Sequence, residues 1–557
     1  MTNLVEGDDN IMQRLVVQFK SSGPKRFKGS RSGGIASRRR RSMAGKKSVQ
    51  AAEETVGGFH WSTNKLTAST AAMIVLFAVL VRVLVSLGPY SGQGTPPRYG
   101  DYEAQRHWME ITLHTPAVEW YRNTAANNLS YWGLDYPPLT AYQSLVHALV
   151  VNRSLPESLA LFSSRGFESP RSKLLMRWTV MSSDFLVFFP AAVWFVTVYW
   201  KRFDGSGREW SAPWLLAVIL LNPCLILIDH GHFQYNCISL GLTLGAVAAS
   251  LSRHDNIASL LFSLAINHKQ MSMYFAPAFF SYLLGKCLKH QNWVLQVGKL
   301  GIVVVGTFVI VWWPYLYSLE AAKEVLYRLA PFERGLYEDY VANFWCSTSV
   351  IIKWKRLFSI GALKLLSMFA TVLAVLPACY QQIKAPSDHA FIYCLLNSSF
   401  AFYLFSFQVH EKSILLPLLP ASLLAQKEPW LFVLLVHSGL LSMFPLLLRD
   451  NLLLQYAAIL PLFGFIFFSP NGGENSREDY SSVRKKVLLA LLFVISFVLH
   501  LIYLTLEPPR KYPFLFEALI MFFCFSQFLC LTIWTNIHQF KNATSSSGKK
   551  KKNNNKP

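Results

Sequence analysis

Long uninterrupted apolar blocks divide the chain into candidate membrane spans. The clearest blocks cover residues 67–87, 174–200, 302–317, 363–376, 430–448 and 487–506. A helix needs about 20 mostly apolar residues to cross the hydrocarbon core of a bilayer. Other apolar stretches are short or broken by Asn, His or Pro, and at membrane depth such segments must pack against helices or line a cavity. The pattern predicts an all-α polytopic membrane protein with about 12–14 transmembrane helices.

Charged residues concentrate at the two ends of the chain. Residues 1–66 contain 13 Lys and Arg against 5 Asp and Glu, and residues 541–557 contain 6 Lys and no acidic residue. Both segments are polar enough to predict disorder, and Lys and Arg near membrane spans favour the cytoplasmic side. We therefore expect a basic disordered cytoplasmic arm (1–66), a membrane domain (67–540) and a Lys/Asn-rich cytoplasmic tail (541–557), which requires an even number of spans.

The composition excludes several other classes of protein. Only 15% of the 557 residues are charged and 52% are apolar, whereas about 25% are charged in soluble domains. These values exclude a soluble enzyme, a secreted disulfide scaffold and a disordered chain. Basic ends can also bind nucleic acid or anionic lipid. Because the ends hold 14 of the 22 net positive charges, membrane orientation is the simpler interpretation, and no nucleic-acid partner is expected.

The longest polar stretch between apolar blocks, residues 88–173, carries the best candidate chemistry. It contains seven basic and seven acidic residues, and a neutral loop opposite a basic arm belongs on the non-cytoplasmic side. Asp101 and Glu103 lie near its start. A D-x-E pattern alone is typical of a solvated turn, but Trp132 and Asp135 follow among further aromatic residues. Aromatic rings cover the apolar faces of sugars while polar groups bind hydroxyls, so the loop predicts a carbohydrate site.

Ionisable residues within apolar blocks are the remaining candidates, because each is unfavourable there unless it is paired or faces water. Asp184 lies alone, and a buried hydrogen bond or ion pair is the expected explanation. His230 and His232 are separated by about 200° on a regular helix, which opposes shared metal ligation. We interpret them as the interfacial end of a span, and Asp450 as part of a turn between spans.

The segment His410-Glu411-Lys412 lies between two apolar blocks. His410 and Lys412 near a membrane face could hold a lipid phosphate, with Lys as a point charge and His as a hydrogen-bond donor. Ordinary snorkelling of Lys412 toward the interface explains the same pattern. Composition alone leaves these two interpretations open.

Several longer motifs resemble one family. They are GDYEAQRHWME at 100–110, WGLDYPPLT at 132–140, DHGHFQYN at 229–236, APFERGL at 330–336 with NFW at 343–345, and VHEKS at 409–413. In this order they resemble the dolichyl-phosphate-glucose glucosyltransferases of the endoplasmic reticulum, which have the GT-C fold. The resemblance covers about residues 67–540 and implies that this part is the catalytic domain, with residues 88–173 as a large first lumenal loop.

The resemblance implies an inverting reaction that needs no cofactor and no metal. The EAQRHWME run is similar to the branch that transfers the first glucose, in α-1,3 linkage, to a terminal mannose of the dolichyl-pyrophosphate oligosaccharide. The second-glucose branch is the alternative within the family. A lipid or sugar transporter is the alternative from another class, and would place polar residues near the midplane of several spans. The expected location is the endoplasmic-reticulum membrane, with a lumenal active site and both termini cytoplasmic.

Residue roles follow from the motif positions. The resemblance matches Asp101 to the catalytic base and His410 to the contact with the donor phosphate. Local chemistry adds weaker assignments, which are Glu103 as a supporting carboxylate, Lys412 and Arg334 at the donor phosphate, and Trp132 and Asp135 as acceptor contacts.

Overall fold

A computed structural model describes residues 66–97, 99–203, 211–330, 336, 339–468 and 483–553, with side chains to residue 541 and none for 483–485. These residues belong to one of two units of the chain, Trp61–Pro557. Residues 1–65 of the predicted arm, and Arg334, lie outside the described residues.

Helices form throughout the described ranges, which contain no β-strand. The prediction of an all-helical membrane protein is therefore confirmed. The α-helices are α2 (Ala68–Ser86), α3 (Asp101–His114), α4 (Pro138–Ser154), α5 (Pro170–Ser183), α6 (Phe189–Phe203), α7 (Ala212–Leu220), α8 (Pro223–Ile226), α9 (Asn236–Leu251), α10 (Asp255–His268), α11 (Ala276–Cys287), α12 (Trp293–Trp312), α13 (Leu319–Leu329), α14 (Phe344–Thr348), α15 (Trp354–Leu357), α16 (Ile360–Lys384), α17 (Asp388–Phe405), α18 (Leu415–Leu423), α19 (Pro429–Ser442), α20 (Phe444–Arg449), α21 (Leu453–Phe467), α23 (Val483–Thr505) and α24 (Leu515–Asn553).

Seven helical segments within the described ranges are long and apolar enough to cross a membrane. They are Ala68–Ser86, Pro170–Phe203, Ala212–Phe233, Trp293–Tyr315, Ile360–Lys384, Lys486–Thr505 and Leu515–Lys541. Three shorter apolar helices are Asn236–Leu251, Pro429–Ser442 and Leu453–Phe467. The predicted total of about 12–14 spans counts short and interrupted segments as well, and it stays a prediction.

The long helices differ in how much protein surrounds them. In the apolar window of Ala212–Phe233 every residue is buried, whereas only 6% are buried in Lys486–Thr505 and 11% in Trp293–Tyr315. Exposed apolar side chains on this scale suit contact with lipid. The segment Ala212–Phe233 therefore lies inside the bundle, and α12 and α23 form part of the lipid-facing surface of the bundle.

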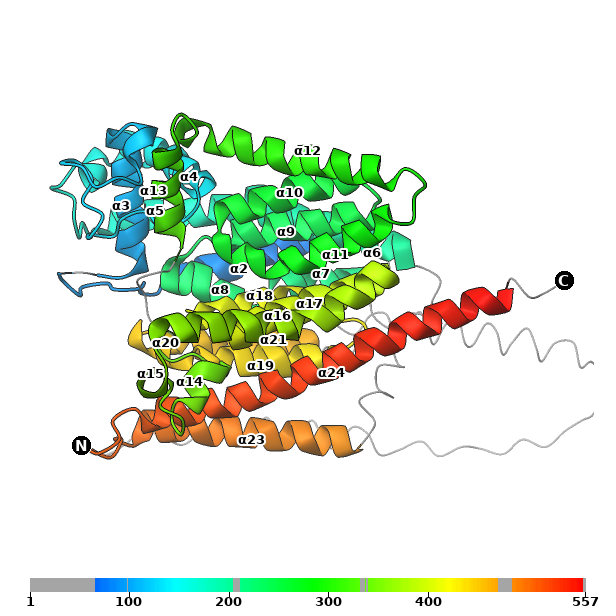
Figure 1. Cartoon of the computed structure of the whole chain (residues 1–557). Helices are drawn as coiled ribbons and strands as arrows, with labels where there is room; N and C mark the ends of the chain where they lie inside the picture. The colour runs from blue at the N-terminus through cyan, green and yellow to red at the C-terminus, as the bar shows by residue number, and fades with distance from the viewer. Residues whose placement is uncertain are drawn as a thin grey trace, which may run out of the picture. The chain divides into compact units, whose positions relative to one another are not determined.

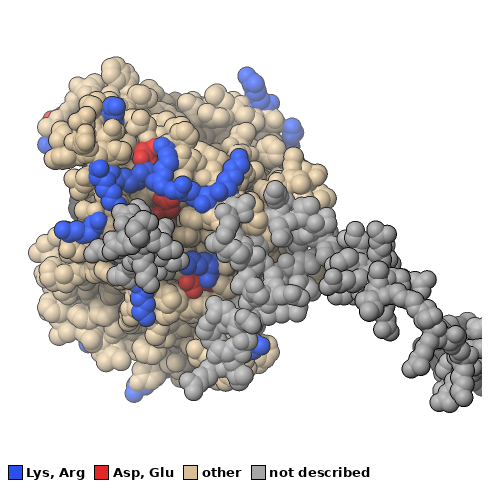
Figure 2. All heavy atoms as spheres, turned by 90° about the vertical axis from the view of Figure 1, so that its right-hand side faces the viewer, with Lys and Arg blue, Asp and Glu red and all other residues tan. Residues whose placement is uncertain are grey.

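The helices run side by side, and their ends define two ends of the bundle (Figure 1). α3, α4 and α13 gather at the left-hand end in Figure 1, where α3 and α13 stand across the direction of the long helices. Figure 2 shows the other end, which carries many Lys and Arg and few Asp and Glu side chains. Basic side chains therefore outnumber acidic ones on the face seen in Figure 2.

A buried ion pair joins α2 to the π-helix Asp184–Phe188, which follows α5. The Arg82 Nε donates to Asp184 Oδ2 at 3.0 Å, and His230 Nε2 lies 2.5 Å from the same oxygen. Their side chains are no more than 1% exposed. The prediction of a buried ion pair for Asp184 is confirmed, and because removing one partner would leave an uncompensated charge, we assign the cluster to structure.

The last helix extends beyond the boundary predicted for the membrane domain. α24 continues to Asn553, whereas the tail was expected to begin at residue 541. Propagation of an existing helix adds one hydrogen bond per residue without a new nucleus, and so the apolar part of α24 can extend helix into the polar sequence that follows.

Candidate active site

Asp101 is the first residue of α3, and the local sequence fixes its position. Gly100 precedes it, and the Asp101 backbone N–H donates to Ser91 Oγ at 3.3 Å. A Cβ on Gly100 would lie 2.4 Å from that same Oγ, so the close approach requires glycine. A carboxylate at a helix N-terminus is also favoured by the helix dipole. Asp101 is therefore held at the edge of the loop with its side chain 22% exposed.

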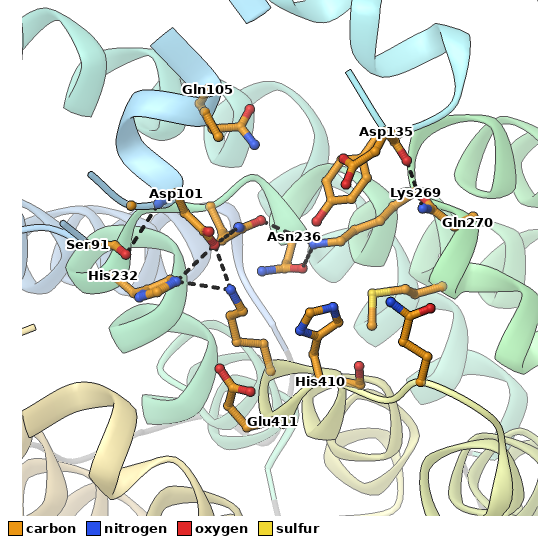
Figure 3. Close-up of a pocket in the computed structure, with 18 of the residues that line it drawn as sticks. Ser91, Asp101, Gln105, Asp135, His232, Asn236, Lys269, Gln270, His410 and Glu411 are labelled. Atoms are coloured by element: carbon orange, nitrogen blue, oxygen red, sulfur yellow. Dashed lines mark hydrogen bonds and ion pairs between the residues drawn. The ribbon is translucent and has the colours of Figure 1, made fainter. Parts of the chain in front are cut away.

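Three donors that are distant from Asp101 in the sequence contact one oxygen of its carboxylate. Lys412 Nζ donates to Asp101 Oδ2 at 2.6 Å, and His232 Nε2 lies 3.0 Å from it. The Gln234 side-chain amide donates to the same Oδ2. Figure 3 shows Asp101 and His232 converging from separate helices. Within the described part of the chain, Oδ1 receives no hydrogen bond and is the oxygen left for a substrate.

These neighbours determine the charge of Asp101. Burial alone would raise the pKa of Asp101, but the positive charge of Lys412, followed by His232, outweighs it and holds the pKa well below its usual value. Asp101 is therefore ionised at neutral pH. An ionised carboxylate with one uncommitted oxygen can accept a proton from a hydroxyl group.

His232 is held in place by its own partners. Its Nδ1 contacts Asp450 Oδ2 while its Nε2 contacts Asp101, so both nitrogens must carry a proton for both contacts to be hydrogen bonds. The backbone carbonyl of His232 accepts from Ser91 N–H at 3.0 Å. Phe233 next to it has a φ of 91°, a strained value for a residue with a Cβ. The π-helix Leu227–Phe233 ends here, and such segments are frequent at functional sites.

A second cation lies on the other side of the same cavity. Lys269 Nζ donates to Asn236 Oδ1 at 2.6 Å and to Gln234 Oε1 at 3.3 Å. It also lies 4.9 Å from the centre of the Tyr136 ring. Its hydrogen-bond acceptors are thus neutral oxygens, unlike the carboxylate that accepts from Lys412.

The cavity between these groups is large enough for a sugar and part of a lipid. It encloses about 960 Å³, near the upper end of the range of about 300–1,000 Å³ for ligand pockets. His410 points into it, and Glu411 and Gln105 lie on opposite sides (Figure 3). Among the predicted site residues, the structure brings five to this cavity, which are Asp101, Trp132, Asp135, His410 and Lys412.

Glu103 is buried outside this cavity. Its two oxygens accept from Arg106 Nε and Nη2, both at 2.7 Å, and Oε1 also accepts from Tyr131 at 2.9 Å. Arg106 Nη2 donates further to Glu110 at 2.8 Å. These contacts fasten α3 to the surrounding loop. A supporting role in chemistry stays a prediction for Glu103, and Arg334 lies outside the described residues.

The cavity residues that make the polar contacts described above but were not predicted as site residues from the sequence include His232, Gln234, Lys269 and Asp450. His232 and Gln234 belong to the quoted motif DHGHFQYN, which is a signal that could have found them. The interpretation of His232 as an interfacial residue was incomplete because it assumed a regular helix. Asp229, His230 and His232 have different partners, and in the described residues no three His, Cys, Asp or Glu side chains form a candidate metal site.

Fold and cavity together define the class of this protein. It is a multi-pass membrane protein in which an ionised carboxylate and two lysines line one cavity at the end of a helical bundle. A carboxylate can accept a proton and lysines can stabilise a phosphate, so the cavity suits a membrane enzyme that transfers a polar group carried by a lipid.

Comparison with known proteins gives the family. Residues 78–534 match the model of the ALG6, ALG8 glycosyltransferase family. A similar protein from Arabidopsis thaliana, a probable dolichyl pyrophosphate Man9GlcNAc2 alpha-1,3-glucosyltransferase, is 58% identical over 486 residues, which cover 86% of this chain and 91% of the relative. Relatives with the same activity in their names occur in Dictyostelium discoideum (43% identical; 84% of this chain and 94% of the relative) and Pongo abelii (43%; 84% and 95%). The chain belongs to the ALG6, ALG8 glycosyltransferase family, which confirms the family predicted from the motifs.

Proposed function

We propose that this protein transfers glucose from dolichyl-phosphate-glucose to a terminal mannose of the dolichyl-pyrophosphate-linked oligosaccharide Man9GlcNAc2, forming the first α-1,3 linkage. The observation that carries the proposal is the ionised Asp101 facing the same cavity as Lys412 and His410. The names of the relatives, all Man9GlcNAc2 alpha-1,3-glucosyltransferases, support this acceptor.

The reaction is a single displacement. The mannose hydroxyl oxygen attacks the anomeric carbon of glucose, and its proton passes to Asp101 Oδ1. The bond between that carbon and the phosphate oxygen breaks, and dolichyl phosphate leaves with the electron pair. Because the donor is β-linked and the product is α-linked, one inversion suffices and no covalent intermediate is needed.

In the proposed reaction, cations stabilise the phosphate leaving group. Negative charge develops on the phosphate as the bond breaks, and positioned donors stabilise it most strongly where water is excluded. Lys412 and His410 lie on the segment that precedes α18 and line the cavity. Phosphate is a fair leaving group once its charge is held, so the proposed reaction uses no general acid and no metal.

Two alternatives are weaker than this proposal. A second-glucose transferase is a possibility within the same family, but the relatives named above act on Man9GlcNAc2 according to their names. A transporter would need polar groups along a path through the bundle. The buried Arg82, Asp184 and His230 instead bond to one another, and the cavity residues gather at one end.

The topology is part of the proposal. We place the active site on the lumenal face of the endoplasmic reticulum and both termini in the cytoplasm. The basic end in Figure 2 supports this orientation, since Lys and Arg accumulate on the cytoplasmic side. Arg202, in the last turn of α6, and Arg253, between α9 and α10, both pair with Asp388 and do not line the cavity.

The proposed reaction is tested with purified protein in detergent containing EDTA. Dolichyl-phosphate-glucose and unglucosylated dolichyl-pyrophosphate oligosaccharide are supplied, and the product mass is measured. A gain of one hexose is expected. If a folded protein extends only the singly glucosylated oligosaccharide, the second-glucose branch is correct instead.

A further inference from the structure

Lys412 Nζ lies next to the proposed base and next to His232. This nitrogen is 2.6 Å from Asp101 Oδ2 and 3.2 Å from His232 Nε2. The side chains of Lys412 and Asp101 remain 19% and 22% exposed. Both line the cavity into which His410 points (Figure 3). The ammonium therefore pairs with the proposed base at a site that a phosphate can reach.

Within the described part of the chain, the other lysines and arginines that line the cavity are bound differently. Arg449 pairs with Asp339 at 3.1 Å, and both side chains are more than half exposed, so this pair lies in water. Arg328 Nη2 donates to the carbonyl of Gly133 at 3.0 Å, and Lys269 bonds to amide oxygens. Among these lysines and arginines only Lys412 pairs with the carboxylate that must accept the proton.

This pairing creates a conflict that the reaction has to resolve. A carboxylate bonded to an ammonium is a weak base, because the ammonium stabilises its ionised form. A phosphate bound beside His410 offers Lys412 a second anion. One small ammonium with three donors on a flexible stem can move between the two, whereas His232 is buried and fixed by Asp450.

We propose that the donor phosphate withdraws Lys412 from Asp101, so that binding of the glucosyl donor itself produces the active base. This inference rests on the proposed function and specifies its order of events. His232 and Gln234 keep Asp101 in place after Lys412 has moved. The acceptor hydroxyl then meets a stronger base only when the glucose it attacks is present.

The proposal has a reciprocal consequence. If the phosphate and Asp101 compete for Lys412, any change that removes the negative charge of Asp101 must strengthen donor binding by the same coupling. Asp101→Asn is therefore expected to transfer glucose far more slowly and yet to bind the donor more tightly. A lysine that simply anchors the base, or binds both anions at once without competition, does not produce this effect.

The test measures binding in the absence of acceptor. Dolichyl-phosphate-glucose in detergent is titrated at neutral pH into the wild-type protein, Asp101→Asn, Lys412→Met and the double variant, with Kd measured by microscale thermophoresis. Asp101→Asn is expected to bind roughly 5- to 30-fold more tightly, within the usual range for coupling between two binding events. Lys412→Met is expected to bind more weakly, and adding Asp101→Asn to it should give no gain.

A matched control is the pair Lys286–Asp255, also a lysine and an aspartate, at 2.5 Å. These residues do not line the cavity, so Asp255→Asn should leave the Kd unchanged. An unchanged or weaker Kd for Asp101→Asn overturns the proposal, as does a gain that persists in the double variant. If Asp101→Asn does not fold, Asp101→Ser replaces it with the same expectation. Failure of every folded variant to bind the donor would instead contradict the proposed function.

Discussion

Glu103→Gln distinguishes a structural from a chemical role for the second carboxylate of the D-x-E motif. Glu103 accepts two hydrogen bonds of 2.7 Å from Arg106 and one of 2.9 Å from Tyr131. The side chains of Glu103 and Arg106 are 3% and 0% exposed. The amide of Gln would turn an NH₂ group toward donors that now meet a carboxylate oxygen. The substitution therefore breaks a buried ion pair and introduces an unfavourable donor contact.

The expected loss of folding stability depends on the hydrogen bonds that Arg106 keeps after the substitution. Breaking a buried ion pair destabilises a protein by about 3–5 kcal/mol when one charge is left uncompensated. Arg106 keeps its 2.8 Å bond to Glu110 and another to Ser164. We therefore expect a loss near the lower limit, about 3 kcal/mol. Because Glu103 does not line the cavity, kcat of the folded protein should change little.

Thermal unfolding in detergent and initial rates on the same preparation measure the two effects separately. Glu157→Gln is the control, since Glu157 lies on the same loop but is exposed, and its change should stay within about 0.5 kcal/mol. Glu103→Gln is expected to lower the unfolding midpoint clearly and leave kcat within a few-fold of wild type. A normal midpoint with a large loss of kcat would refute this reasoning and assign Glu103 to the chemistry.

Three further predictions concern the base, its position and the topology. The pKa of Asp101 lies below its usual value of 3.8, so the carboxylate becomes protonated only at a lower pH than that. The value of kcat/KM for the donor reports the free enzyme and should therefore stay level from pH 7 to about 5. A decline centred above pH 5 would contradict this. Gly100→Ala places a Cβ 2.4 Å from Ser91 Oγ and should lower kcat about 10- to 100-fold by displacing the base, with a normal rate as the contrary result. Asn128 in N-L-S is exposed and should carry a glycan, whereas Asn542 in N-A-T should not; a glycosidase-sensitive mass shift removed by Asn542→Gln would reverse the orientation.

The long membrane helices could be predicted closely from the sequence, because each needs only a continuous apolar run long enough to cross the bilayer. The apolar block 67–87 corresponds to Ala68–Ser86, and the block 487–506 to Lys486–Thr505. Helices such as α9 and α10 were harder to delimit, since they pack among other helices and need no continuous apolar run. Their short length and polar residues are explained by packing against neighbouring helices, which the sequence pattern does not reveal.

The site was predicted in part, for a comparable reason. Asp101 and Lys412 are 311 residues apart, and their contact depends on packing of the whole bundle. The resemblance supplied Asp101 and His410, but the partners of His232 depend on a π-helix and a left-handed residue that no periodicity indicates. Asp450 was interpreted as part of a turn. It does follow the end of α20, but its carboxylate also fixes His232.

Comparison of wild type and Asp101→Asn by product mass tests the central claim most directly. The assay supplies dolichyl-phosphate-glucose and the unglucosylated dolichyl-pyrophosphate oligosaccharide to equally folded proteins. Wild type should add one hexose, and Asp101→Asn should be slower by about 10²–10⁴-fold, the usual contribution of a general base. Transfer by Asp101→Asn at a rate near that of wild type would show that Asp101 is not the base.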